Sequence, residues 1–373
     1  MRSKFAFLSL FALSHFSSHA FAQTASISNS NQTISLNNTD TSLQGTSATP
    51  TSGASAGTTT AAAACPSLIE RREWRTLDDD EKANYINAVL CLQSLPPADK
   101  TNTVAKSRFD EFQGVHISSA DSVHLVGQFL PWHRYYLLRY ETALREECYY
   151  EGGTPYWDWT IEADSEDSLL SAPVFDAESG FGGEGVPGTY TPPDDPTGEN
   201  RIFPEAFHGC VQDGPFANLT LHYGPGKYIT DHCLTRGVND TMKEFLNSAA
   251  VANATAQPNF ELFRIEVEGE PVTPTHKVHD GGHIGIGGEM SNFYSSPGDP
   301  LFFLHHANLD RIWRSWQMST PSRLFEVTGR STVDPPYTNI TLDFILDVQT
   351  LGPAVAIRDI MDIQSSPGCY TYV

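Results

Sequence analysis

Eleven histidines lie beyond the apolar N-terminal segment of this chain, and six of them fall into two sets of three. The first set is His116, His124 and His133. The second set begins with His279 and His283, which share one face if their segment is helical, and ends with His306. Three imidazoles without carboxylate or thiolate suit copper, and zinc also accepts them. Two such sets predict a dinuclear centre, for which zinc has little redox use. For any single histidine, a hydrogen-bonded core position explains the residue as well as ligation does.

Three segments are predicted to be helices because their apolar residues recur on one stripe or because they begin with suitable residues. They are segments 78–92, 132–148 and a third that runs from Asp299-Pro300 to about Gln317. The strand signal is thin, with 261–267 as the best candidate, and long loops rich in glycine and proline are clearest at 176–200. We therefore expect a mainly helical core.

The N-terminal residues carry a targeting signal. Arg2 and Lys4 precede a short apolar run, and small residues follow it, so residues 1–22 are predicted to be a removed secretion signal. Residues 23–64 are nearly all Ser, Thr, Ala, Asn, Gln and Gly, and we predict that they form a disordered leader. Residues 65–373 have an ordinary globular composition. Their length alone allows two domains, but the motif positions favour one.

Charge and cysteine content narrow the class of protein. The formal net charge of −22 argues against nucleic acid or an anionic membrane as a partner. All six cysteines follow the leader, and an even count in a secreted chain suggests three disulfides with fifteen possible connectivities. Glycosylation sequons fit the same compartment. They begin at Asn31, Asn37, Asn218, Asn239, Asn253 and Asn339.

Long motifs around the histidines resemble those of the type-3 copper proteins, namely tyrosinases, catechol oxidases and hemocyanins. The segment that begins at His124 and continues, after four residues, with FLPWHR is similar to the family's first copper signature. His133 is the histidine of FLPWHR. The second signature is similar to DPLFF at 299–303, then His306 and Asp310, and another family block resembles PYWDW at 155–159. The similarity extends from about residue 65 to 373, with the spacing of short secreted fungal members.

The resemblance implies a central four-helix bundle that holds a dinuclear copper site, with long loops and a few short strands. It implies two copper ions bound by His116, His124, His133, His279, His283 and His306. In the family the second of two adjacent histidines is the ligand, so His305 is not included. Four other histidines match no ligand position and are interpreted as structural or surface residues, although His276 is three residues before His279 and could face a metal. They are His208, His222, His232 and His276.

The resemblance also implies roles for residues around the ligands. Phe302 matches a position whose ring covers the copper pair and restricts entry, with plain core packing as the alternative. Asp280 and Ile284 follow two ligands at positions where the family tunes its substrates, although Asp280 could be a surface carboxylate. Asp310 is one helical turn after His306 and could orient an imidazole. The alternative for Asp310 is an ion pair with Arg314.

Two further features bear on covalent links. Many fungal tyrosinases have a cysteine two residues before the second ligand, joined to another histidine, but Ser122 stands there and we expect no such crosslink. The end of the chain, from Cys369 to Val373, looks like the tyrosine motif that closes the family's catalytic domain. The two end cysteines flank the folded part and the other pairs are sequence neighbours. We therefore predict Cys65–Cys369, Cys91–Cys148 and Cys210–Cys233.

By this resemblance the chain is a secreted oxidase that converts ortho-diphenols to ortho-quinones and reduces dioxygen to water. Its partners would be a small phenolic substrate and dioxygen. Alternatives are a tyrosinase that hydroxylates monophenols, an ortho-aminophenol oxidase, a hemocyanin-like oxygen carrier and a zinc hydrolase. We predict that diphenols are preferred, because the charge of Asp280 repels a phenolate and Phe302 limits rotation of the substrate. Against this, an aspartate could itself accept the phenolic proton.

Overall fold

The computed structural model describes residues 64–270 and 275–373 of the chain, and these belong to one compact unit. The predicted signal, 1–22, and the predicted leader as far as residue 63 lie outside the described residues. Ala64, the last residue of that leader, forms a β-bridge with Ser365. At this residue the expectation of a disordered leader was wrong, because the backbone pairs with the C-terminal segment.

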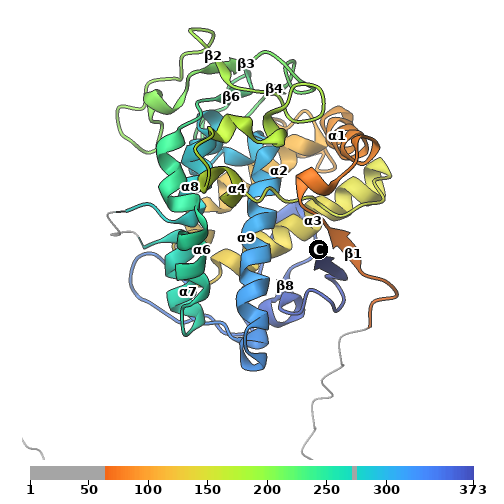
Figure 1. Ribbon diagram of the computed structural model, residues 1–373, viewed down its shortest axis with the longest axis vertical. Coiled ribbons are helices and arrows are strands. Elements are labelled where there is room, and N and C mark those ends of the chain that lie inside the picture. The colour runs from red at the N-terminus through yellow and green to blue at the C-terminus, as the bar shows by residue number, and fades with distance from the viewer. Residues whose placement is uncertain (1–63, 271–274) are drawn as a thin grey trace, which may run out of the picture. The chain divides into compact units, whose positions relative to one another are not determined.

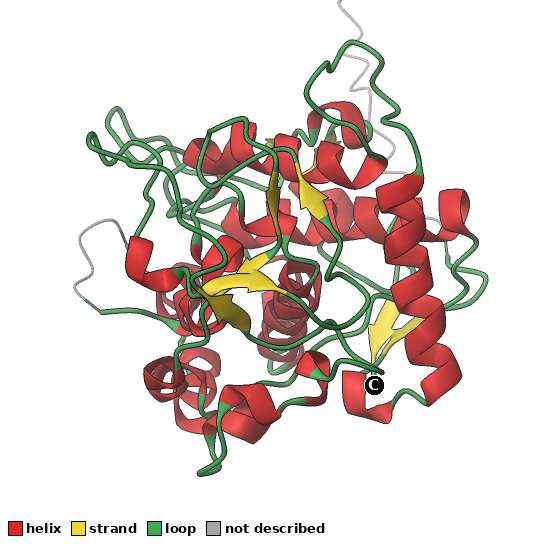
Figure 2. Cartoon of the chain, turned by 90° about the horizontal axis from the view of Figure 1, so that it is seen from above, coloured by secondary structure: helices red, strands yellow, loops and turns green. Residues whose placement is uncertain are grey.

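Helices dominate the described part of the chain, so the prediction of a mainly α fold is confirmed (Figure 1, Figure 2). The longest helices are α1 (Asp79–Ser94), α2 (Arg108–Val123), α3 (Phe129–Cys148) and α9 (Leu301–Met318). The shorter helices are α4 (Thr160–Ala163), α5 (Lys243–Leu246), α6 (Ser248–Thr255), α7 (Phe260–Glu268) and α8 (Val278–Ile286). A regular four-helix bundle remains a prediction.

Within residues 64–270 and 275–373 the strands are short and form four small sheets. The strands are β1 (Ile69–Arg71), β2 (Gly185–Pro187), β3 (Gly209–Val211), β4 (Thr220–Leu221), β5 (His232–Cys233), β6 (Thr235–Arg236), β7 (Ile345–Leu346), β8 (Val355–Ala356) and β9 (Tyr370–Tyr372). Strand β1 pairs in parallel with β9, so both ends of the described chain meet in one sheet. The other sheets have the orders β2-β3-β6, β4-β5 and β7-β8. Figure 1 shows β2, β3, β4 and β6 gathered at one end of the unit, above α8 and α9.

Polar caps fix where two of the long helices begin. Asp78 accepts a hydrogen bond from the backbone N–H of Glu81, and Glu81 accepts one from the N–H of Asp78, each at 2.9 Å. Ser107 and Asp110 form the same reciprocal pair at the start of α2. These caps satisfy backbone donors that a helix start leaves unpaired. The predicted stripe of α1, from Tyr85 to Leu92, faces the core.

Segment 261–267 is helix α7 rather than the predicted strand. Apolar and charged residues alternate from Phe263 to Val267, as they would in a strand. The buried residues, however, follow a helical period, with Phe260, Phe263 and Val267 buried. Asn259 caps the helix by accepting a hydrogen bond from the N–H of Leu262 at 3.0 Å. The cap and the helical face outweigh the strand-like alternation.

The three predicted disulfides are all present. Cys65 is bonded to Cys369, with the two Cα atoms 5.4 Å apart. The other two bonds join Cys91 to Cys148 and Cys210 to Cys233. The disulfide Cys65–Cys369 lies beside the β1-β9 sheet, where the N–H of Ile69 donates to the carbonyl of Cys369 at 2.9 Å. Within the described ranges, none of the helices has the length and apolarity that crossing a membrane requires.

Candidate metal centre

The six predicted histidine ligands come together from four helices. His116 lies within α2, and His124 is the residue that ends it. The others lie within α3, α8 and α9: His133, His279, His283 and His306. In each set of three, hereafter a triad, one nitrogen of every histidine lies within 4.8 Å of the others. The triads face each other, because the rings of His133 and His306 stack with centroids 4.6 Å apart.

Backbone carbonyl groups orient the imidazoles. A carbonyl oxygen only accepts hydrogen bonds, so each ring nitrogen bonded to one must carry the proton. The Nδ1 atoms of four histidines donate in this way. The bonds are His116 to Tyr294 at 2.7 Å, His124 to Ala120 at 3.0 Å, His133 to Phe129 at 2.9 Å and His283 to Met290 at 2.8 Å. Each neutral ring therefore keeps its Nε2 lone pair for a metal, as metal-ligating histidines usually do.

The residues fit two metal ions. The Nε2 atoms of His116, His133 and His279 are buried and have no hydrogen-bond partner among the described residues. The Nε2 atoms of His283 and His306 lie 3.1 Å apart. Burial lowers the pKa of His116 to about 4, and burial together with neighbouring histidines lowers that of His133 and His306 well below the ordinary value. These three rings are therefore neutral at neutral pH, which is the form that binds a metal.

His305, next to His306, has both of its ring nitrogens engaged. Its Nε2 donates to the carbonyl of His279 at 3.1 Å, and its Nδ1 accepts a hydrogen bond from the indole of Trp159 at 3.2 Å. No lone pair is left for a metal. The expectation that His305 is not a ligand therefore has a physical basis in this chain.

The ring of His305 fits against α8 only because residue 282 is glycine. A Cβ atom at Gly282 would lie 2.1 Å from Cε1 of His305, whereas the nearest atom to one at Gly285 of the same helix would be the end of a flexible leucine side chain at 3.2 Å. We expect Gly282→Ala to destabilise the protein by roughly 1–3 kcal/mol, because the hydrogen-bonded ring cannot move aside.

Gly285→Ala is the matched control for this prediction and should be neutral or stabilise by about 0.5–1 kcal/mol, since alanine favours helix. Urea unfolding of both variants measures the difference. Equal stability of the two would show that His305 is not held in place.

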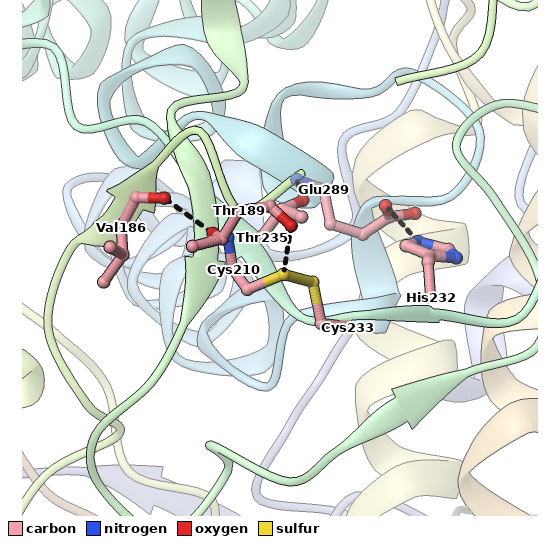
Figure 3. The surroundings of a disulfide bond; sticks show 7 residues. All are labelled: Val186, Thr189, Cys210, His232, Cys233, Thr235 and Glu289. Atoms are coloured by element: carbon pink, nitrogen blue, oxygen red, sulfur yellow. Dashed lines mark hydrogen bonds and ion pairs between the residues drawn. A yellow bond between two sulfur atoms is a disulfide. The ribbon is translucent and has the colours of Figure 1, made fainter. Parts of the chain in front are cut away.

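One segment carries two of the orienting carbonyls, those of Met290 and Tyr294, and a buried carboxylate holds its start. Glu289 accepts a hydrogen bond from Nε2 of His232 at 3.1 Å, and the N–H of Glu289 donates to the hydroxyl of Thr235 at 3.1 Å. Figure 3 shows these groups beside the disulfide Cys210–Cys233. Burial lowers the pKa of His232, but the hydrogen bond and charge of Glu289 outweigh it and raise that pKa. His232 is thus a structural residue that steadies the segment.

Phe302 lies in the core beside the second triad. Its side chain is fully buried, and its ring stacks on His306 with centroids 4.1 Å apart. This position fits a ring that covers the copper pair as well as its alternative, plain core packing, so the restriction of entry by Phe302 stays a prediction. The partly exposed aromatic ring beside the triads is Phe293, whose centroid is 4.8 Å from that of His124. Sequence reasoning missed Phe293 because it lies between the motifs.

Asp280 and Ile284 are both partly exposed next to the second triad. The carboxylate of Asp280 lies 3.2 Å from Nδ1 of His279 and 3.5 Å from Nδ1 of His276. Burial would raise the pKa of Asp280, but these hydrogen bonds hold it below its ordinary value. Asp280 is therefore ionised at neutral pH. His276 is exposed, bonds to Asp280 and is outside both triads.

Asp310 does not bond to an imidazole. It accepts hydrogen bonds from Nε of Arg134 at 2.6 Å and from the hydroxyls of Tyr370 and Tyr372, each at 2.6 Å. The alternative pairing also fails, because Arg314 forms its ion pair with Asp362. Asp310 instead ties α9 to α3 and β9.

A further buried carboxylate near the first triad, Glu268, was missed because it directly follows the segment read as a strand and belongs to no motif. Its Oε1 accepts a hydrogen bond from the N–H of Leu125, the residue after His124, at 2.6 Å. Burial raises the pKa of Glu268 to about 8, although Arg264 opposes this. Glu268 fixes the sharp turn after His124, where Leu125 has a φ of 60°.

The remaining histidines lie away from the triads, as expected. His208 is exposed beside Glu184, and His222 pairs with Asp231 at 2.7 Å. Neither belongs to a group of residues that could hold a metal.

Comparison with known proteins decides the family. Residues 106–319, more than half of the chain, match the common central domain of tyrosinase. The chain belongs to the tyrosinase family. Members of this family are dinuclear copper proteins, and the two triads of this chain could bind two metal ions.

Relatives in fungi indicate that this member of the tyrosinase family is an oxidase. It is 33% identical over 339 residues to tyrosinase P of Aspergillus terreus, which covers 83% of this chain and 93% of that protein. It is also 33% identical over 341 residues to an N-acetyl-6-hydroxytryptophan oxidase of Emericella nidulans, covering 81% and 91% of the two chains.

Solved structures show the same fold. A variant of the polyphenol oxidase from Thermothelomyces thermophila aligns with a TM-score of 0.72 and 33% identity, covering 82% of this chain and 89% of that one. A tyrosinase from Burkholderia thailandensis aligns with a TM-score of 0.51 and 17% identity over 83% of this chain and 75% of that one, a likeness of fold alone.

Proposed function

We propose that this chain is a copper-dependent oxidase of ortho-diphenols, which it converts to ortho-quinones while dioxygen is reduced to water. The observation that carries the proposal is the pair of facing triads of buried histidines in a tyrosinase-family chain. We propose His116, His124 and His133 as ligands of one copper. The ligands of the other would be His279, His283 and His306.

The reaction balances with two substrates for each dioxygen. Each ortho-diphenol gives up two electrons and two protons, and one dioxygen takes up all four of each to form two waters. The copper pair, when bound, supplies dioxygen binding and electron transfer. The residues of the chain hold the imidazoles neutral and oriented, through carbonyls such as those of Tyr294 and Met290. The buried ring of Phe302 keeps water from the inner side of the site.

A preference for diphenols over monophenols follows from the charge at Asp280. Hydroxylation of a monophenol needs a phenolate turned toward the site, and an ionised carboxylate beside His279 repels it. We expect initial rates on 4-methylcatechol to exceed those on tyrosol by at least tenfold in the copper-loaded protein, the equivalent of about 1.4 kcal/mol. Asp280→Asn should raise the tyrosol rate relative to the 4-methylcatechol rate.

Asp343→Asn, which makes the same change at an exposed position, is the control and should keep the parent ratio. Comparable rates on both substrates in the parent would contradict the preference. A fall of the tyrosol rate in Asp280→Asn would show that the carboxylate accepts the phenolic proton. Including ortho-aminophenol in the same panel decides between diphenol and aminophenol oxidation.

The rival from another class is an oxygen carrier similar to hemocyanin. Turnover of catechol, rather than reversible oxygen binding alone, separates an oxidase from a carrier. The relatives named as a tyrosinase and as an N-acetyl-6-hydroxytryptophan oxidase support the enzyme.

We also propose that the protein is secreted. The support is the predicted signal at residues 1–22 and three disulfides, which persist in oxidising compartments. N-terminal sequencing of the protein recovered from culture medium tests this, and the chain is expected to lack residues 1–22.

A further inference from the structure

A cationic side chain lies one aromatic ring away from the first triad. The guanidinium carbon of Arg201 is 3.9 Å from the centroid of the Phe293 ring, on which it forms a cation–π contact. The same ring contacts His124, with centroids 4.8 Å apart. Arg201 is exposed, and Phe293 is partly exposed. The guanidinium therefore stands where a substrate that reaches His124 from solvent would pass.

The backbone around Arg201 is held in one conformation. Arg201 has a left-handed φ of 51°, which costs a non-glycine residue about 1–2 kcal/mol and persists only where neighbours enforce it. The carboxylate of Asp195 accepts hydrogen bonds from the N–H groups on either side, those of Asn200 at 3.0 Å and Ile202 at 3.3 Å. The loop thus presents Arg201 in a fixed place.

Asn292 ties this loop to the segment that carries Phe293. Its Nδ2 donates to the carbonyls of Asn200 at 2.9 Å and Arg201 at 3.2 Å. Its Oδ1 accepts from the N–H of Tyr294 at 2.9 Å. Tyr294 supplies the carbonyl that orients His116. The guanidinium and the first triad are therefore positioned from the same short segment.

No carboxylate of the described residues lies within 4.0 Å of the Arg201 guanidinium, whereas the neighbouring charges are paired. Asp121 accepts from Lys227 at 2.8 Å and from the hydroxyl of Tyr294 at 2.9 Å. Lys227 also lies 4.2 Å from the centroid of the Tyr294 ring. The carboxylates of Asp121 and Asp195 lie near this loop, and the charge of Arg201 helps to lower the pKa of Asp121, but neither carboxylate forms an ion pair with the guanidinium, whose N–H donors can still bind an anion.

We infer that Arg201 is a specificity-determining residue that binds the carboxylate of an ortho-diphenol bearing an acidic side chain. A guanidinium presents a planar pair of N–H donors that matches a carboxylate. Arg201 lies beside the first triad and the negative charge of Asp280 beside the second, so an acidic group is favoured at one side and repelled at the other. The inference rests on the proposed function for the diphenol part, and on the position of Arg201 for the acid.

The test compares two substrates that differ in charge but hardly in shape, 3,4-dihydroxyphenylacetate and its methyl ester. In the copper-loaded parent we expect kcat/KM for the acid to exceed that for the ester by roughly fivefold, about what an exposed charge pair supplies. In Arg201→Gln the ratio should fall to about one through KM of the acid, and in Arg201→Lys it should be intermediate. Added salt should lower the ratio in the parent.

Arg358→Gln is the control for net charge, because this exposed arginine pairs with Asp343 at the surface. It should keep the parent ratio. A parent ratio near one, or an unchanged ratio in Arg201→Gln, would overturn the inference.

A second measurement separates the inference from the proposed function. Phenylacetate and methyl phenylacetate lack hydroxyl groups and cannot form quinones, so their affinities for the copper-loaded protein are measured by calorimetry without turnover. Tighter binding of phenylacetate in the parent, lost in Arg201→Gln, supports the inference even if no catechol is oxidised. Equal binding of the two probes in the parent counts against Arg201, even if 4-methylcatechol is oxidised rapidly.

Discussion

The His283→Ala variant is expected to bind about one copper per chain instead of two and to lose essentially all oxidase activity. His283 is held by the carbonyl of Met290, and its Nε2 lies 3.1 Å from that of His306, so removing it leaves the second triad with two imidazoles. The remaining copper cannot supply the chemistry of a pair. His133→Ala should have the same effect at the first triad. Elemental analysis of the purified variants, together with catechol turnover, measures both quantities.

His208→Ala is the matched control, since this exposed histidine bonds only to Glu184 at the surface. It should keep two coppers and full activity. Two coppers and full turnover in His283→Ala would show that the ligand assignment is wrong. Two zinc ions and no copper in the parent would favour the zinc alternative. Circular dichroism of each variant establishes that it is folded.

The triads could be predicted from sequence because their spacing is local and their motifs are long. His279 and His283 are one helical turn apart, so finding α8 places both rings together. His133 and His306 each lie in a helix whose apolar face is clear in the sequence. The disulfide Cys65–Cys369 was predictable for a different reason, because its two cysteines flank the folded part of the chain.

The errors arose where local pattern and tertiary contact disagree. Segment 261–267 alternates like a strand, but Asn259 caps it and Phe260, Phe263 and Val267 pack on one helical face. The partly exposed ring of Phe293 has no periodic signal, because it lies in a loop between two motifs.

Other residues around the site could not be found from spacing at all. Glu289 is adjacent to Met290 in sequence, but its partner His232 comes from β5. Arg201 reaches Phe293 from a loop more than ninety residues earlier in the chain. Such contacts depend on how the loops between 176 and 240 fold against the segment 289–294, which no local pattern encodes.

Asp310→Ala is expected to lower the free energy of unfolding of the copper-free, disulfide-bonded chain by about 3–5 kcal/mol, because it leaves the buried charge of Arg134 without a carboxylate partner. The carboxylate of Asp310 lies 2.6 Å from Nε of Arg134 and 3.5 Å from Nη1 of Arg71, and all three side chains are buried. Arg134 follows His133, and Asp310 is one turn beyond His306, so the ion pair joins the two helices at the metal centre. Urea unfolding with the disulfides intact measures the change.

The control is Asp343→Ala, which removes a carboxylate from an exposed pair with Arg358. Exposed pairs contribute about 1 kcal/mol or less, so this variant should unfold close to the parent. Asp310→Asn retains the shape and most hydrogen bonds but removes the charge, and its stability should lie between those of the parent and Asp310→Ala. Equal stabilities for Asp310→Ala and Asp343→Ala would show that the buried carboxylate is not needed to balance Arg134.

The contribution of Asp310 to the free energy of unfolding should be lost at low pH and unchanged near neutral pH. Burial would raise the pKa of Asp310, but the charges of Arg134 and Arg71 and the hydroxyls of Tyr370 and Tyr372 outweigh it and hold the pKa below its ordinary value. A carboxyl whose pKa is lowered by folding stabilises fully above the pKa of the unfolded chain, about 3.9, and loses that effect as pH falls through the lowered value. The gap in unfolding free energy between the parent and Asp310→Asn should therefore be constant from neutral pH to about pH 5 and shrink only below about pH 4. A gap that shrinks instead as pH rises from 5 to 8 would mean that Asp310 is protonated in the folded chain, and that Arg134 is not balanced by its charge.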